Sequence, residues 1–384
     1  MIIFQKVGVL CVIVDRTHTK KFPNKPLENK LFMTLYEQGY RLPAEWEKHS
    51  AVWLAWPNDE TAFPNRMEEV QNTYCQIIKS LVQSEEVNLI VLNEDIKNII
   101  EEKLKHFEIN LNKVNFFLQD YNDVWVRDYA PIILIHENEN KLIWTKWNYN
   151  AYGKSDDPYF TELLKDNEVF LNINKTLNNE IIKPAIVLEG GAIDVNGFGT
   201  LLTTEQCLLN PNRNHNLNKE QTEQNLREYL KVESIIWLKE GLINDHTDGH
   251  IDEIARFVSP NTIVCAYEDD INDPNFAILD NNLKVLENAT DKIGNKFKII
   301  KLPMPHMVYD NGEKAPVSYA NFYIGNSVVL MPYFNDPNDE KAIEVIKNLF
   351  PDHKIIQIDC SNLIYGGGGL HCITMQQPEG NVVQ

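Results

Sequence analysis

The stretch that decides the fold class is VNLIVL, residues 87–92, a short apolar run of the kind that forms a buried strand. A helix is predicted before it, over residues 67–83. The apolar side chains that share one face of that helix are Val70, Tyr74, Ile77, Ile78 and Leu81. A second helix is predicted over residues 95–106 and a second strand over residues 114–118. This alternation of strands and amphipathic helices indicates an α/β protein.

The same pattern recurs along the chain, with hairpins between its repeats. The further helix–strand pairs are expected at 218–230 with 235–238, at 273–288 with 297–302, and at 338–349 with 354–358. Tight primed turns are predicted at Asn196-Gly197 and Gly325-Asn326, each between two β-rich runs. Because no low-complexity linker interrupts this region, we expect one domain of repeated α/β units over residues 41–384.

Residues 1–40 are expected to be an extension in front of that domain. An apolar run over residues 7–14 follows Lys6 and is long enough for the core of a signal peptide. However, charged residues follow it without a small-residue cleavage site. The sequence therefore favours an N-terminal extension, and secretion remains the alternative.

The composition excludes several kinds of partner. The 384 residues are 43% hydrophobic and carry a formal net charge of −19, which argues against nucleic acid or an anionic membrane and is compatible with a cationic ligand. The six cysteines include no CxxC pair, so reduced thiols and a cytoplasmic location are expected. No apolar run reaches the ~18 residues of a membrane span.

One cysteine lies in an unusual setting near the end of the chain. Cys372 follows a run of four glycines, residues 366–369, which frees the backbone to approach a ligand closely. A thiol in such a loop is placed for nucleophilic attack. A buried, inert cysteine beside a flexible turn is the competing interpretation, and the segment alone does not choose between the two.

Three charged clusters lie elsewhere, on predicted strand ends or loops. The first surrounds Trp125 and contains Asp128, and taken alone it favours a surface ion pair beside a packed indole over a ligand site. In the second, Glu189 closes an apolar strand predicted over residues 185–188 and precedes two glycines, a common ligand position that a simple turn cap would also explain.

The third cluster is HTDGHIDE, residues 246–253. If the segment is extended, His250 and Asp252 point to one face and form a general acid/base with a charge anchor. Zinc binding is the alternative, because this segment holds two histidines and three acids. A cysteine nucleophile needs no metal, so we expect none. Several carboxylates around one thiol indicate a cationic substrate, and a guanidinium matches paired acids best.

Together these motifs resemble the agmatine deiminases of the guanidino-group-modifying (pentein) superfamily, which includes the bacterial peptidylarginine deiminases. The segments that carry the resemblance, in chain order, are residues 41–47, 53–57, 125–128, 188–191, 249–252 and 366–378. The fold it implies is a five-bladed α/β propeller of ββαβ units. The activity it implies is hydrolysis of agmatine to N-carbamoylputrescine and ammonia, in putrescine and polyamine biosynthesis, without a cofactor.

The resemblance also implies roles for single residues. Cys372 matches the nucleophile, His250 the general acid/base, and Asp128 and Asp252 the acids that hold the guanidinium. Glu189 matches a further acid beside the site. Trp125 and Gly369 match substrate contacts.

Peptidylarginine deimination, amidino transfer and non-catalytic guanidinium binding are the alternative functions. We expect neither nucleic acid nor membrane as a partner, and a homo-oligomer is compatible with the sequence.

Overall fold

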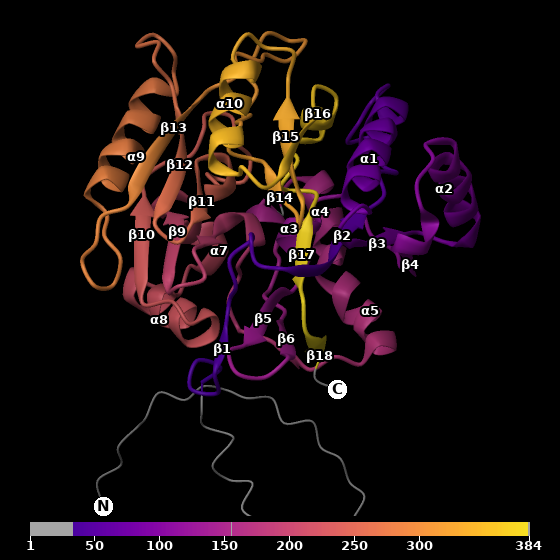
Figure 1. Cartoon of the computed structure of the whole chain (residues 1–384), viewed down its shortest axis with the longest axis horizontal. Coiled ribbons are helices and arrows are strands. Elements are labelled where there is room, and N and C mark those ends of the chain that lie inside the picture. Colours follow the sequence, from indigo (N-terminus) through magenta and orange to yellow (C-terminus); the bar gives the residue numbers. More distant parts are fainter. Residues whose placement is uncertain (1–33, 155, 383–384) are drawn as a thin grey trace, which may run out of the picture. The chain divides into compact units, whose positions relative to one another are not determined.

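The computed structural model describes residues 34–154 and 156–382 (Figure 1). Within these residues the strands form five separate sheets. Each sheet contains the same unit: an antiparallel strand pair, followed by one or more helices that lead to a third strand parallel to the second. The repeated α/β architecture expected from the sequence is therefore present.

The elements of the five units follow a common order. Four units are continuous in sequence. The first consists of β5 (Ile132–His136), β6 (Lys141–Thr145), α4 (Pro158–Leu163), α5 (Val169–Leu177) and β7 (Ile181–Ile182), and the second of β8 (Asp194–Val195), β9 (Thr200–Thr204), α6 (Glu205–Leu208), α7 (Pro211–Asn214), α8 (Lys219–Leu230) and β10 (Ser234–Leu238). The third consists of β11 (Ala255–Ser259), β12 (Thr262–Tyr267), α9 (Phe276–Asn288) and β13 (Lys298–Pro303), and the fourth of β14 (Tyr323–Ile324), β15 (Val328–Tyr333), α10 (Asp339–Leu349) and β16 (Lys354–Asp359). The fifth unit is β17 (Met375–Pro378), β2 (His49–Ala55), α1 (Met67–Leu81) and β3 (Glu86–Val91), to which α2 (Glu94–His106) and β4 (Val114–Leu118) are added.

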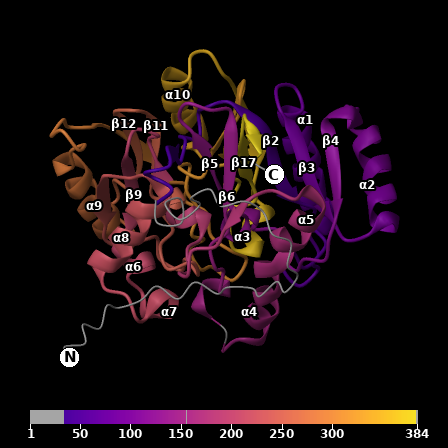
Figure 2. The same cartoon turned by 90° about the horizontal axis from the view of Figure 1, so that it is seen from below.

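The fifth unit joins the two ends of the described chain. Strand β17 pairs antiparallel with β2, although more than 300 residues separate them, and the two lie side by side in Figures 1 and 2. The first sheet is likewise extended by β1 (Tyr40–Arg41) against β5 and by β18 (Asn381–Val382) against β6. These long-range pairings bring the segment that carries Cys372 next to the start of the domain.

Apart from the strand expected over residues 185–188, the sequence predictions for helices and strands are confirmed to within three residues at each end. The predicted apolar face of α1 is fully buried, and β3 is buried along nearly its whole length because it lies between β2 and β4. Helix α8 begins at a capping box in which Asn218 and Gln221 satisfy each other's backbone N–H groups.

Three local predictions are wrong. The strand expected over residues 185–188 is reduced to one bridge between Asn148 and Val187, because this segment meets no longer partner strand. The segment expected to be extended forms a single 3-10 turn, η6 (Ile251–Glu253). Both predicted hairpins are present, but Asn196 in the first turn and both residues of Gly325-Asn326 in the second lack positive φ, so neither turn is of the primed type.

Part of the predicted extension, residues 1–33, lies outside the described residues. In the part that the structure describes, no helix is both long and apolar enough to cross a bilayer. The five cysteines described are buried and form no disulfide with one another.

Candidate active site

The candidate site residues occupy equivalent places in the five units. In every unit a short segment just before the first strand of the hairpin carries a polar group. These groups are Asp128 before β5, Glu189 to Gly191 before β8, Asp252 before β11, Asn321 before β14 and Cys372 before β17. Their contacts show that these segments meet: Gly191 N–H donates to Asp128 Oδ1 at 3.0 Å, and Cys372 Sγ lies 3.8 Å from Asp252 Oδ2.

A pocket with an empty volume of about 310 Å³, including its opening, lies where these segments meet. Its lining consists of Trp125, Asp128, Tyr152, Asp245, His246, Thr247, His250, Asp252, Glu253, Pro316, Gly367, Gly368 and Cys372. Four of these side chains are acidic, and no lysine or arginine is among them. The pocket is therefore suited to a cation.

Cys372 is 7% exposed and is held from both sides. Its carbonyl accepts the backbone N–H of Arg127 at 3.1 Å, and Asn321 Nδ2 donates to Sγ at 3.3 Å. Burial, together with the charges of Asp252 and Glu253, raises the pKa of the Cys372 thiol well above its ordinary value. The thiol is therefore protonated at neutral pH until a positive charge enters the pocket.

The two carboxylates assigned to the guanidinium have different surroundings. Asp128 accepts from Gly191 N and from the Tyr152 hydroxyl, both at 3.0 Å. Burial and the nearby charge of Asp252 raise the pKa of Asp128 to about 6. Burial also opposes ionisation of Asp252, but the hydrogen bond and charge of His371, together with the charges of His250 and Arg256, outweigh it and lower the pKa of Asp252. Asp252 is thus the more firmly ionised of the pair.

His250 is 1% exposed, and its Nδ1 lies 3.7 Å from Asp128 Oδ1. Neither ring nitrogen has an oxygen or nitrogen partner at hydrogen-bond distance among the described residues. Burial disfavours its charged form, but the charge of Asp128 and contact with the Cys207 thiol raise the pKa of His250 well above its ordinary value. His250 is therefore a proton donor held in the pocket and free to act on a ligand.

The remaining predicted residues lie at different distances from the pocket. Trp125 lines it, and its ring packs so closely on the glycine loop that a Cβ added at Gly368 would lie 2.7 Å away. Gly369 does not line the pocket; its backbone hydrogen bond to the thiol favours the ionised sulfur and lowers the pKa of Cys372. Glu189 is fully buried outside the lining and accepts from Arg213 Nε at 2.6 Å.

Three residues to which the sequence analysis assigned no role belong to the site or touch it. Glu253 Oε1 lies 3.9 Å from Cys372 Sγ, Asn321 donates to the sulfur, and His371 bonds Asp252. The sequence contained a signal for Asn321, because this residue immediately precedes a β-rich run of a predicted hairpin. In the structure Cys372 lies in a similar place, just before β17. The sequence contained no such signal for His371, because its partners are more than 100 residues away in the chain.

A metal-ligand arrangement does not explain the cluster behind the pocket. Among the described residues, Glu189, Cys207 and His250 bring one potential ligand atom each to within 4.8 Å of one another. Glu189, however, is already ion-paired with the buried Arg213, so its charge is compensated without a metal ion. The zinc alternative placed on the His246 to Asp252 segment fares no better, because Asp252 bonds His371 and Asp248 bonds Arg213.

Comparison with known proteins places this geometry in a family. The sequence profile of the Porphyromonas-type peptidyl-arginine deiminases matches residues 41–378. A Legionella pneumophila relative whose assigned name proposes an agmatine deiminase is 36% identical over 345 residues, covering 89% of this chain and 96% of the relative.

Solved structures agree with that relationship. The agmatine deiminase of Enterococcus faecalis superimposes with a TM-score of 0.82 at 31% identity, over 90% of this chain and 98% of that one. A C. jejuni agmatine deiminase variant with substrate bound gives 0.79 at 31% identity, over 89% and 97% of the two chains. The α/β architecture and the family resemblance expected from the sequence are therefore confirmed.

Proposed function

Because the chain belongs to the Porphyromonas-type peptidyl-arginine deiminase family, we propose that it hydrolyses agmatine to N-carbamoylputrescine and ammonia. The observation that carries this proposal is a buried thiol that shares one pocket with four carboxylates and two histidines. Carboxylates that outnumber their cations bind a guanidinium through charge-assisted hydrogen bonds. The thiol then lies within reach of the guanidinium carbon.

Asp128 and Asp252 hold the substrate cation in this proposal. Asp252 Oδ1 has no hydrogen-bond partner among the described residues, so it is open to accept from a guanidinium N–H. Asp128 is oriented by Gly191 and Tyr152 on the other side of the pocket. Trp125 supplies an aromatic wall, which favours a cation over its face.

The reaction proceeds in two halves. The Cys372 thiolate attacks the guanidinium carbon and forms a C–S bond, and the C–N bond to one terminal nitrogen breaks as His250 protonates that nitrogen and ammonia leaves. A cationic thiouronium remains on the sulfur. His250 then takes a proton from water, the hydroxyl adds to the same carbon, and the C–S bond breaks to return the thiolate. The hydroxyl proton of the product is released and matches the proton that the free ammonia takes up in solution. Asp128 and Asp252 stabilise the positive charge throughout.

The substrate itself generates the thiolate in this scheme. In the empty pocket three carboxylates surround Cys372, and His250 already holds its proton, so no group there takes the thiol proton. A bound guanidinium offsets the carboxylate charges and stabilises the thiolate, and the thiol proton is released to solvent as the substrate binds. This supports activation by the substrate cation over activation by the histidine alone, the two sources that the sequence left open.

Agmatine is favoured over arginine by the charge of the pocket. Arginine carries a carboxylate at its far end, and no lysine or arginine lines the pocket to receive it. We expect kcat/KM for agmatine to exceed that for free arginine by at least ~100-fold, which corresponds to ~2.7 kcal/mol. Incubation with agmatine, arginine and an arginine peptide, with ammonia and ureido product measured for each, tests this. A preference for the peptide would replace agmatine by peptidyl-arginine as the substrate.

We also propose the finer architecture and the context of the enzyme. Five sheets with the same ββαβ unit, closed by the pairing of β17 with β2, support a five-bladed propeller. The compact unit over residues 34–384 supports one deiminase domain over residues 41–384, with 1–40 as an extension. The proposed enzyme acts on a small guanidino compound in the cytoplasm, without metal, nucleic acid or membrane. The net charge of −19 supports the exclusion of nucleic acid and membrane as partners. Self-association into a homo-oligomer is compatible with this charge.

A further inference from the structure

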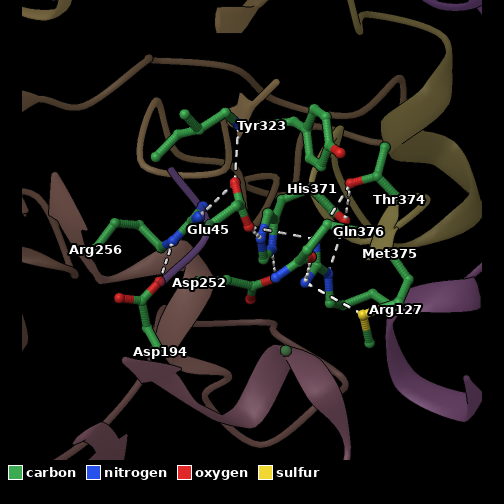
Figure 3. A network of polar contacts seen from close by, with 12 residues as sticks. Glu45, Arg127, Asp194, Asp252, Arg256, Tyr323, His371, Thr374, Met375 and Gln376 are labelled. Carbon is green, nitrogen blue, oxygen red and sulfur yellow. Dashed lines mark hydrogen bonds and ion pairs between the residues drawn. The ribbon is translucent and has the colours of Figure 1, made fainter. Parts of the chain in front are cut away.

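His371, the chain neighbour of Cys372, bridges two buried carboxylates. Its ring is 2% exposed, with Nδ1 at 2.7 Å from Asp252 Oδ2 and Nε2 at 2.7 Å from Glu45 Oε2 (Figure 3). An ionised carboxylate can only accept hydrogen bonds. If both acids are ionised, both ring nitrogens must donate, and His371 is an imidazolium.

The surroundings keep both acids ionised. Burial opposes the charge of Glu45, but Arg256 and then His371 overcome it and lower the pKa of Glu45 well below its ordinary value. Glu45 lies 2.9 Å from Arg256 and 3.5 Å from Arg127, so its charge is neutralised from two sides. Burial likewise opposes the charge of Asp252, and His371 supplies the hydrogen bond that lowers the pKa of Asp252.

The two oxygens of Asp252 therefore have separate tasks. Oδ2 is bound by His371, whereas Oδ1 has no partner among the described residues and is left for a ligand. We propose that His371 is a positioning residue, a buried imidazolium that keeps Asp252 charged and presents its Oδ1 to the substrate guanidinium. This role rests on the proposed deiminase function.

His371 is itself held in place by hydrogen bonds between its backbone groups and neighbouring side chains. Its N–H donates to Asn321 Oδ1 at 2.7 Å, and its carbonyl accepts from Thr374 Oγ1 at 2.8 Å and Arg127 Nε at 3.3 Å. The same arrangement fixes the peptide that carries the Cys372 thiol. The bridge thus couples the position of the nucleophile to that of Asp252, the carboxylate proposed to bind the substrate.

Other charges face the bridge from every surrounding segment. The charged and titratable groups are Glu45, Arg127, Asp128, Asp194, His250, Glu253, Arg256, Tyr323 and Cys372. Asp128 and Glu253 oppose a charge on Asp252, and His250 and Arg256 favour it. Only His371 both favours the charge and hydrogen bonds the carboxylate directly.

The change that tests the proposal is His371→Asn. Asparagine keeps one N–H donor near Asp252 but removes the positive charge, so the pKa of Asp252 rises and the acid limb of kcat/KM moves to higher pH. The activity deficit relative to wild type should therefore be largest at low pH. We expect it to grow as pH falls from about pH 8 to about pH 4.5, by up to ~10-fold for each unit by which the pKa of Asp252 rises.

Thr374→Val is the matched control, because it removes a hydrogen bond from the same residue's carbonyl and leaves the imidazole in place. Its pH profile should keep the wild-type shape even if its activity is lower. A His371→Asn deficit that stays constant across the pH range would overturn the positioning role, because a purely structural defect has no reason to follow the ionisation of Asp252.

A second measurement does not depend on agmatine turnover. In the wild-type protein, proton NMR of the slowly exchanging imidazole region should show two N–H signals from His371 that vanish together in His371→Asn. A single His371 N–H signal would show a neutral ring and overturn the proposal. Two signals in a protein that does not hydrolyse agmatine would leave the imidazolium bridge intact and refute only the proposed reaction.

Discussion

Two neighbouring groups of charges meet at Asp252 and differ in how they are paired. In the first, the polar network of Glu45, Arg127, Asp194, Arg256 and His371, every charged group has an opposite charge within 3.5 Å (Figure 3). In the second, the pocket cluster, carboxylate and imidazole atoms lack partners. Its members are Asp128, His250, Asp252, Glu253 and Cys372.

The difference shows which charges maintain the fold and which await a ligand. Each charge of the polar network is paired with an opposite charge, so breaking the network leaves an uncompensated buried charge. In the pocket cluster, Asp252 Oδ1, Glu253 Oε2 and both His250 nitrogens have no hydrogen-bond partner among the described residues. Such unpaired buried groups cost stability in the empty protein and gain partners when a cation binds. Mutations in the two groups should therefore have opposite effects on stability.

The largest expected effect is on catalysis, in the pocket cluster. Cys372→Ser should lower kcat by at least about 10⁴-fold while the melting temperature stays near that of wild type, because the alkoxide is far harder to form than the thiolate. Cys360→Ala is the matched control, since Cys360 is equally buried but lies outside the pocket lining. If the control loses activity and Cys372→Ser does not, the nucleophile has been assigned to the wrong residue.

The next effect is on stability, in the polar network. Glu45→Gln should lower the free energy of unfolding by about 3 kcal/mol, because Arg127, Arg256 and His371 lose their shared counter-charge. Urea unfolding near neutral pH measures it. Glu47→Gln breaks the partly exposed ion pair with Arg41 and should cost less than about 1 kcal/mol. Equal losses of unfolding free energy in the two variants would mean that burial does not increase the contribution of the polar network to stability.

The pH dependence of activity tests the weaker carboxylate of the pocket. With the pKa of Asp128 near 6, the residue is ionised above that pH and protonated below it. Only the ionised form holds the guanidinium, so kcat/KM should fall about tenfold per pH unit below pH 6. Steady-state kinetics from about pH 4.5 to about pH 8 measure this limb. Asp128→Asn should remove the inflection together with most of the activity.

The smallest expected effect is a gain in the free energy of unfolding from Glu253→Gln, whereas most substitutions of buried residues lower it. Burial, together with the charge of Asp252, raises the pKa of Glu253 well above its ordinary value, so the folded state binds this proton more tightly than the unfolded state. Stability is therefore lost as pH rises above the unfolded-state pKa. Glu253→Gln should recover about 1 kcal/mol at pH 8, and the gain should disappear near pH 4.

Thermal unfolding of both proteins at the two pH values decides this last prediction. A loss of stability at pH 8 would show that Glu253 is part of the structural scaffold, like the polar network. A gain of stability accompanied by weaker agmatine binding would instead place Glu253 among the residues that bind the substrate.

Local patterns were predictable wherever the chain's own periodicity determines burial. The buried face of α1 and the limits of β4 follow from spacing alone. The glycine run predicted a loop that approaches other groups, and the ring of Trp125 does pack against it. The strand expected before Glu189 failed because an apolar run becomes a strand only if a partner strand is available, and here only one bridge forms.

The sequence by itself determined the α/β units, the order of the motifs and the residue types of the site, because these depend on short-range periodicity and on segments that can be compared with a family. Only the tertiary structure decided which of those residues face the pocket. It placed Glu189 behind His250 against Arg213, brought Glu253 and Asn321 to the thiol, and set His371 between Asp252 and Glu45. The physical reason is that charge and hydrogen bonding act between atoms close in space, and the pairing of β17 with β2 makes neighbours of residues more than 300 positions apart.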